Sequence, residues 1–414
     1  MPAQLHTDNR SAVGKWRTLI IFFLLGMVVL HAAILWQMRG LIAEGYGDFA
    51  AFYTAGKLVQ HGQASAMYDR RAQWSAQQEF AADVKIRRGP LPYIRPPFEA
   101  LVFFLLAYLR YPVAYLVWTT LKILILFAIP FLLQPHLLSE PLLPPLLQGV
   151  LALAYFPVAF ELLQGQDAIL FFLLFCLAFA ALQRGADFRA GVWLALGLFK
   201  FHLVIPIVLI FALRRKTRVV FGFLCSAAAL LLISAGLVGW AGIVAYPKYL
   251  WSLNQASGVG MVYTESMPNL RGLAGALGLR GIYSHWIAVP VAAVGIIVAA
   301  YLWRPADDQD RRLSIAGFSL SIVLTILTSY YAYCYDMMLL LIPIVLLGNR
   351  RVWRNEPGGW PQRLLVACMA LLLFSPLYWV LTLNLNQFYW MAVVLLLLAV
   401  ALAGCMKRWR EPVA

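Results

Sequence analysis

Long apolar segments without charged residues recur along the chain and are separated by short basic clusters. The first runs from Thr18 to Met38, which is longer than the apolar region of a signal peptide, so we expect it to remain as the first membrane span. A polar stretch, residues 40–97, follows it. The last uncharged run is long enough for two spans that turn near Asn384. The runs between them cover residues 123–139, 141–160, 168–183, 219–247, 281–303 and 313–335.

The composition supports the same interpretation. Hydrophobic residues make up 62% of the 414 residues and charged residues only 12%, whereas about a quarter of an ordinary soluble domain is charged. A soluble protein could not bury so much apolar surface. We therefore predict an all-α, polytopic integral membrane protein, residues 1–414 forming a single domain. At about 20 residues per span, the runs predict about ten to twelve transmembrane helices.

The basic clusters indicate the orientation in the membrane. Lys and Arg number 33 against 18 Asp and Glu, a net charge of +15, and the positive-inside rule explains much of this excess without a nucleic-acid partner. With the clusters and both termini in the cytoplasm, residues 190–213 must form a broken pair of half-helices that enters and leaves on one side. Residues 98–110 are then only a partial span. The bacterial inner membrane is the expected location, with membrane lipids as neighbours.

This topology brings four polar segments to the extracytoplasmic face. They are the long first loop at residues 40–97, the turn at residues 164–167, a second loop at residues 241–280, and the pair Tyr335-Asp336. Because these segments are far apart in the sequence, their convergence on one face predicts a functional site there.

Asp48 is the first candidate for catalysis. It lies about ten residues beyond the first span, where the loop leaves the interface. A carboxylate held there could remove a proton from a sugar hydroxyl while that hydroxyl attacks an activated anomeric carbon. The structural alternative is a helix N-cap, because Asp before an aromatic-rich amphipathic stretch is a common helix start.

The second candidate is the pair Lys200 and His202, within an apolar segment that offers Lys200 no obvious carboxylate partner. A charge inside the membrane is costly and indicates a functional site. Lys200 and His202 could bind a phosphate diester, and Arg95 could contribute from the first loop. The alternative is a lysine that extends to the interface. Lys122 and Glu99 are expected to pack or to pair.

The third candidate is Tyr335-Asp336, which follows a tyrosine-rich stretch at the end of an apolar run. Aromatic rings cover apolar sugar faces and a carboxylate accepts protons from sugar hydroxyls, so the pair suits sugar binding. An aromatic belt at the membrane interface would give the same tyrosines, but explains Asp336 less well.

We expect no metal site. Asp308-Gln309-Asp310 has the spacing of the metal-binding D-x-D motif, but it lies among arginines in a predicted cytoplasmic loop, across the membrane from Asp48. A solvated charged loop is the better interpretation. The five cysteines form no C-x-x-C pair, so neither a zinc site nor a disulfide framework is indicated.

Five short motifs, in this order along the chain, resemble glycosyltransferase family 87, a group of polyprenyl-phosphate-dependent membrane enzymes of the GT-C class. The motifs are Gly47-Asp48-Phe49-Ala50-Ala51-Phe52-Tyr53-Thr54-Ala55-Gly56 with Gly62 and Tyr68-Asp69; Pro96-Pro97; Gly165-Gln166; Ala190-Gly191 followed by Lys200; and Ser329 with Tyr335-Asp336. Each motif alone is weak, but their order is fairly specific.

The resemblance implies a GT-C-type helical bundle whose donor is a sugar on a polyprenyl phosphate. Transfer would be inverting, would occur on the extracytoplasmic face and would use no nucleotide. The acceptor would be a lipid or a glycan, and the sugar a mannose-like hexose or arabinofuranose. No cofactor is implied, although some GT-C enzymes use a divalent ion. By position, Asp48 would be the catalytic base; Lys200, with His202 and Arg95, would bind the donor phosphate; and Tyr53, Gln166, Tyr335 and Asp336 would line the substrate pocket.

Two departures from the family pattern put the sugar identity in doubt. Relatives often have Lys-Pro where this chain has Lys200-Phe201, and often have Pro and His where it has Tyr330, Tyr331 and Tyr333. Two other functions stay open. A transporter or lipid-linked-saccharide flippase would also need many spans and a buried lysine, and a non-catalytic assembly subunit would explain the hydrophobicity alone.

Overall fold

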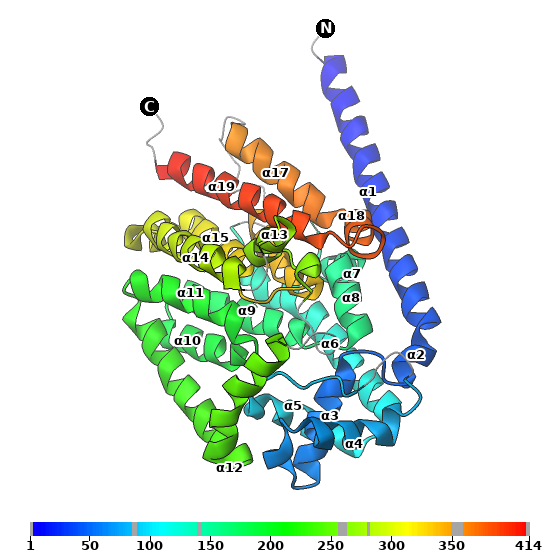
Figure 1. Cartoon of the computed structure of the whole chain (residues 1–414). Coiled ribbons are helices and arrows are strands. Elements are labelled where there is room, and N and C mark those ends of the chain that lie inside the picture. The colour runs from blue at the N-terminus through cyan, green and yellow to red at the C-terminus, as the bar shows by residue number, and fades with distance from the viewer. Residues whose placement is uncertain are drawn as a thin grey trace.

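The computed structural model describes residues 3–84, 89–138, 143–255, 263–279, 282–348 and 359–410. Within these ranges every regular element is a helix and there is no strand, which confirms the predicted all-α class (Figure 1). Residues 85–88 of the predicted first loop and residues 256–262 and 280 of the predicted second loop lie outside the described residues. The α-helices are α1 (Ala3–Gln37), α2 (Arg39–Ala43), α3 (Phe49–Gln60), α4 (Arg70–Ala81), α5 (Ala100–Phe104), α6 (Tyr111–Leu133), α7 (Pro145–Ala154), α8 (Phe156–Gln164), α9 (Ala168–Gln183), α10 (Asp187–Leu196), α11 (Phe201–Leu213), α12 (Thr217–Gln255), α13 (Leu270–Ala276), α14 (Ile282–Leu302), α15 (Arg311–Thr328), α16 (Leu341–Leu347), α17 (Trp360–Leu373), α18 (Ser375–Trp379) and α19 (Met391–Arg410).

Six helical segments among the described residues are long and apolar enough to cross a membrane, or up to eight if each of two bent pairs is one span. This makes the chain a multi-pass membrane protein. The predicted number of ten to twelve is higher, and is reached only if both bent pairs and shorter apolar helices also cross. Large apolar side chains remain exposed on the long helices, such as Phe22 and Trp36 on α1 and Phe221 on α12, as expected of lipid-facing positions.

The segment expected to be a broken pair of half-helices is interrupted where Lys200 lies. α10 ends at Leu196, a 3₁₀ turn η5 (Gly197–Lys200) follows, and α11 begins at Phe201. By length and composition, residues 187–213 qualify as one span. However, the Nζ atom of Lys216, just past α11, lies 3.7 Å from an Oδ atom of Asp187 at the start of α10. The segment therefore enters and leaves at the same end of the bundle, as the charge pattern predicts.

Two further expectations about irregular segments agree with the structure. Residues 98–110 contain only the short helix α5 and two 3₁₀ turns, too short for a span. The final apolar run forms α17 and α18, which are bent by 64° as a pair, and then α19. The reversal lies near residues 384–387, where Asn386 has a positive φ of 51°, a conformation that Asn tolerates better than most residues.

Two apolar clusters support the site. The larger one gathers side chains of α9, α11, α15 and α19, such as Phe179, Phe211, Phe318 and Leu398. The smaller one is aromatic and joins the first loop to the start of α6. Two helices of that loop, α3 and α4, gather with the following α5 at the bottom of Figure 1. The loop is thus packed onto the bundle as part of the fold.

Gly165 sets the distance between these two parts. It ends α8 with φ of +66°, and a Cβ added there would lie 2.6 Å from the Cβ of Phe49 at the start of α3. Any other residue would be strained and would also push the first loop away. This contact brings the residue before Phe49, Asp48, close to the turn between α8 and α9.

Helices α10 and α12 approach each other closely through two glycines. A Cβ at Gly191 would collide with the carbonyl of Val219, and one at Gly222 would collide with the carbonyl of Phe188. Small residues that allow two backbones to approach are typical of helix packing in membranes. This contact holds α10, and with it the break at Lys200, in a fixed place.

The close approach predicts that Gly222→Ala destabilises the protein, because the added methyl meets backbone atoms that cannot rotate away. Overpacking of this kind costs about 1–3 kcal/mol. The matched control is Gly236→Ala on the same helix, where a Cβ meets nothing within 4 Å and the better helix propensity of Ala is slightly favourable. Thermal unfolding of both variants in the same detergent tests this, and equal melting temperatures would contradict it.

Candidate active site

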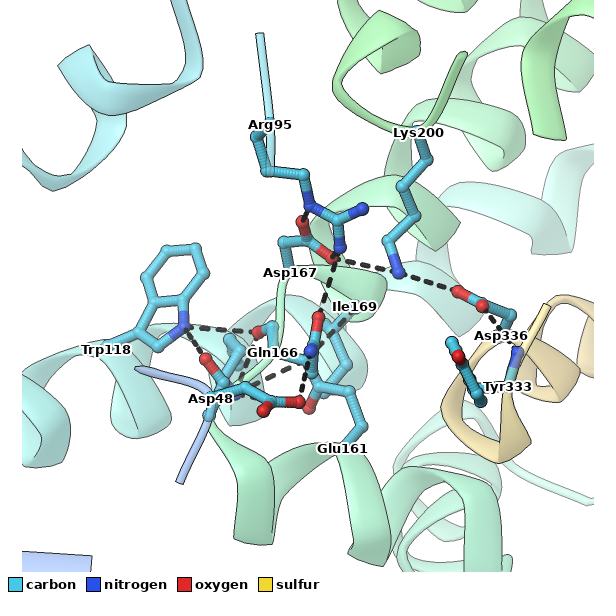
Figure 2. Close-up of polar contacts among 12 residues, drawn as sticks. Asp48, Arg95, Trp118, Glu161, Gln166, Asp167, Ile169, Lys200, Tyr333 and Asp336 are labelled. Atoms are coloured by element: carbon cyan, nitrogen blue, oxygen red, sulfur yellow. Dashed lines mark hydrogen bonds and ion pairs between the residues drawn. The ribbon is translucent and has the colours of Figure 1, made fainter. Parts of the chain in front are cut away.

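Charged and polar side chains from five separate segments form one continuous chain of contacts in the interior (Figure 2). Asp48 precedes α3 and Arg95 precedes the 3₁₀ turn η2 (Pro97–Glu99). Gln166 and Asp167 form the turn between α8 and α9. Lys200 ends η5, and Asp336 lies in the 3₁₀ segment η8 (Cys334–Leu340). We call these six residues, Asp48, Arg95, Gln166, Asp167, Lys200 and Asp336, the polar network.

Asp48 is half-buried at one end of the network. Its Oδ2 atom accepts a hydrogen bond of 2.5 Å from the Nε2 atom of Gln166. Although Asp48 occupies the N-cap position of α3, its side chain makes no capping hydrogen bond. The N-cap alternative is thus correct for the position of Asp48 but not for its carboxylate, which bonds to Gln166 instead.

Two cations and two carboxylates alternate in the rest of the network. The Oδ1 atom of Asp167 accepts a hydrogen bond from Arg95 Nη2 at 3.1 Å and lies 2.9 Å from Lys200 Nζ, and its Oδ2 atom forms an ion pair with Arg95 Nε at 2.8 Å. Lys200 Nζ also lies 2.6 Å from Oδ1 of Asp336. The second oxygen of Asp336 accepts from the backbone N–H of Tyr333. Arg95 Nη2 also donates to Gln166 Oε1 at 3.2 Å, which connects the ion pairs to Asp48.

The charges in the turn and the first loop shift each other's protonation. Burial alone would raise the pKa of the Asp167 carboxyl, but Arg95 and Lys200 outweigh it and lower that pKa to about 2. Burial, together with the charge of Asp167, raises the pKa of Glu99 well above its usual range. Glu99 is therefore the neutral member of this pair of carboxyl groups, and it accepts a hydrogen bond from the Tyr93 hydroxyl at 3.1 Å.

Hydrogen bonds from neighbouring side chains hold the backbone of the network residues. The Trp118 indole donates to the carbonyls of Gly165 and Gln166, and Lys122 donates to the Gln166 carbonyl. Lys122 also forms a fully buried ion pair with Glu161 at 3.2 Å, so it does pair, as the sequence predicts. The Tyr68 hydroxyl donates to the Arg95 carbonyl at 2.8 Å. These bonds leave the turn little freedom to move.

The structure brings most of the predicted site residues together. Arg95, Gln166 and Asp336 meet as expected, and the Tyr335 ring lies under Lys200, with Nζ 4.7 Å from the ring centroid. The apolar segment around Lys200 offers no carboxylate, but the fold supplies two from other segments, Asp167 and Asp336. The alternative of a lysine reaching for the interface fails for the same reason.

Two predicted residues lie away from the network. His202 packs its ring against Tyr331, with centroids 6.0 Å apart. Tyr53 is buried among the aromatic rings of Phe80 and Tyr111 and donates to the carbonyl of Leu109. The position of Tyr53 is that of a core residue that attaches the first loop to α6.

Both carboxylates of the D-x-D sequence are already bound to other groups of the protein. Asp308 pairs with Arg214 and Lys216, and Asp310 accepts from backbone N–H groups at the start of α15. Among the described residues, no group of three His, Cys, Asp or Glu side chains is placed to hold a metal ion.

Asp167 and Glu99 are the residues that sequence reasoning missed as parts of the site. Asp167 directly follows the Gly165-Gln166 motif, and a buried Lys200 requires a counter-ion somewhere in the fold. Those two facts together could have indicated Asp167. Nothing local in the sequence indicates that Glu99 lies behind it.

Removing the Asp167 charge is expected to destabilise the protein strongly. Asp167→Asn leaves two buried cations with one remaining carboxylate, and breaking a buried pair in this way costs about 3–5 kcal/mol. Asp83→Asn, at an exposed position of the first loop, is the matched control and should unfold like the wild type. Thermal unfolding in detergent measures both, and a wild-type melting temperature for Asp167→Asn would refute the bridging role.

Glu99→Gln is expected to gain stability relative to the wild type as the pH rises. Glu99 has a raised pKa in the folded state, so between its unfolded and folded pKa values the native state holds an extra proton. The wild type therefore loses stability as the pH rises through that window. Gln does not titrate, and its side chain is neutral and similar in size to the protonated acid. The difference in melting temperature between pH 5 and pH 8 tests this, and a pH-independent difference would contradict it.

The comparisons with known proteins agree with the motif resemblance. A family model described as glycosyltransferase family 87 matches residues 93–329, which include Arg95, Asp167 and Lys200 but neither Asp48 nor Asp336. No curated protein and no solved structure matches the chain. Because the matched residues make up more than half of the sequence, this multi-pass membrane protein belongs to glycosyltransferase family 87.

Proposed function

We propose that the protein transfers a sugar from a polyprenyl-phosphate donor to a lipid or glycan acceptor at the extracytoplasmic face of a bacterial inner membrane. The observation behind the proposal is the half-buried Asp48 carboxylate, hydrogen-bonded to Gln166 at one end of the polar network. Family membership supports sugar transfer. The network supplies the base, the cations and the sugar-binding groups that this reaction needs.

Asp48 is the general base in this proposal. Its carboxylate takes the proton of the acceptor hydroxyl while that oxygen attacks the anomeric carbon of the donor sugar. The bond from the anomeric carbon to the phosphate oxygen breaks, and its electron pair leaves with the polyprenyl phosphate. Attack opposite to the leaving group inverts the anomeric configuration. Gln166 holds the carboxylate in one orientation through a 2.5 Å hydrogen bond.

Lys200 and Arg95 supply the positive charge for the departing phosphate, whereas the His202 ring, packed against Tyr331, lies outside this pair of cations. Both cations already have carboxylate partners, so the donor phosphate must exchange with one of them. Asp336 is the better candidate for exchange, because its other oxygen stays bound to the Tyr333 N–H. Asp167 is held by both cations and remains in place. No metal is required when two cations face the leaving group.

Tyr335, Gln166 and Asp336 form the sugar-binding side of the pocket. The Tyr335 ring offers an apolar face and the Asp336 carboxylate accepts hydroxyl protons. A mannose-like hexose or arabinofuranose fits these groups. The transporter alternative receives no support from the family match, and a non-catalytic subunit would have no need for Asp48 at the end of the polar network.

The decisive experiment compares Asp48→Asn with the wild type at matched expression. Labelled sugar is supplied on a set of polyprenyl phosphates and its transfer to native membrane lipids is measured. Loss of a general base is expected to lower transfer by about 100-fold or more, while donor binding persists because the cations are intact.

The control is Asp83→Asn, an exposed carboxylate of the same loop, which should transfer like the wild type. Unchanged transfer by Asp48→Asn would remove this residue from the mechanism. Absence of transfer from every donor by the wild type would refute the polyprenyl-phosphate proposal itself.

A further inference from the structure

A cavity of about 370 Å³ lies at the opposite end of the bundle from the polar network. Three helices establish this separation, because each has one end at the network and the other at the cavity. α9 runs from beside Asp167 to Gln183, α11 from Lys200 to Arg214, and α15 from Arg311 to Ser329. With 13 to 18 residues each, they span about 20–27 Å. The cavity is therefore separate from the site described above.

The carboxylates that line this cavity already have partners. The Oδ1 atom of Asp308 pairs with Arg214 at 2.8 Å and its Oδ2 atom pairs with Lys216 at 2.7 Å. Lys216 also lies near Asp187. Thus the negative charges of the lining are balanced within the protein. Arg311 adds a further positive charge, and its contact with the chain is to a carbonyl, that of Pro135.

Three buried nitrogen atoms of the lining have no hydrogen-bond partner among the described residues. They are two N–H donors, the Nη1 atom of Arg214 and the Nε1 atom of Trp303, and the Nε2 atom of His136, which donates in one of its two tautomers. Each of these residues is at most 5% exposed. The two N–H donors come from adjacent side chains, because the Arg214 guanidinium lies 3.8 Å from the Trp303 ring centroid. Unsatisfied buried polar groups are costly, so these nitrogens around one cavity indicate that a ligand with acceptor oxygens completes them.

We propose that this cavity binds a phosphate group, either that of an anionic lipid headgroup or a free phosphate. The lining has an excess of donors and of positive charge once its own ion pairs are formed, and the arginine fork matches phosphate oxygens well. The volume exceeds that of a bare ion and lies within the range of small-molecule sites, so the organic part of a headgroup fits beside the phosphate. The position at the end of the bundle is the depth at which lipid headgroups lie.

The experiment uses the full chain, purified and placed in nanodiscs of phosphatidylcholine. Inorganic phosphate is titrated against sodium chloride of equal ionic strength, and the melting temperature is recorded. In the second arm, native mass spectrometry measures which lipid stays bound when phosphatidic acid or phosphatidylglycerol replaces part of the phosphatidylcholine. A saturating rise in melting temperature with phosphate identifies a free-phosphate site, and selective retention of the anionic lipids identifies a headgroup site.

The variants Trp303→Phe and His136→Leu each remove one donor while keeping an apolar side chain in its place. Each should weaken binding about tenfold, the effect of one hydrogen bond to a charged group. Arg304→Gln is the control, because Arg304 is exposed at the same end of the bundle and is not part of the cavity lining.

If one of the two variants fails to fold, the other still tests the proposal. Binding that falls in either folded variant but not in Arg304→Gln supports the site. Binding that is equal in all of them, or a wild type that binds neither phosphate nor anionic lipid, overturns it.

Discussion

The Asp167 carboxylate, held between the side chains of Arg95 and Lys200, is the interaction on which the rest of the site depends. It is fully buried and makes contacts of 2.8 and 2.9 Å with the two cations. An isolated buried charge is costly, and removing one member of a buried pair leaves that cost uncompensated. Because Arg95 comes from the first loop and Lys200 from the break between α10 and α11, one carboxylate fixes both segments against the turn that carries Gln166.

The break in the α10–α11 segment makes this arrangement possible. A continuous helix would satisfy its own backbone and would present Lys200 on a smooth surface among neighbouring helices. Instead the 3₁₀ turn at Gly197–Lys200 ends one half-helix and starts the other, so the lysine lies at the tip of a re-entrant pair. The close contact of α10 with α12 through Gly191 and Gly222 holds that tip in place. The packing of α10 on α12 thus determines where the charge of Lys200 lies.

The sequence predicts the fold better than it predicts the partners within the site. Hydropathy identifies membrane segments because lipid leaves backbone groups no alternative to helices, and the distribution of arginines indicates that residues 190–213 turn back. The span number is less well predicted, because short apolar helices such as α9 resemble spans in composition. Nothing local pairs Lys200 with Asp336, which is 136 residues away. Tyr53 shows that a motif can also suggest a site residue that the fold uses elsewhere. It lies in a motif of the first loop, but its ring packs in the aromatic cluster.

The position of Gln166 between Arg95 and Asp48 has a chemical consequence for the proposed reaction. A cation in direct contact with Asp48 would stabilise its charged form and make it a weaker base. Gln166 is neutral: its Oε1 atom accepts from Arg95 and its Nε2 atom donates to Asp48. It therefore passes on the orientation fixed by the ion pairs without placing a full positive charge beside the carboxylate. In the proposed reaction, the guanidinium that would bind the phosphate is thus connected to the carboxylate that would act as the base through a neutral amide.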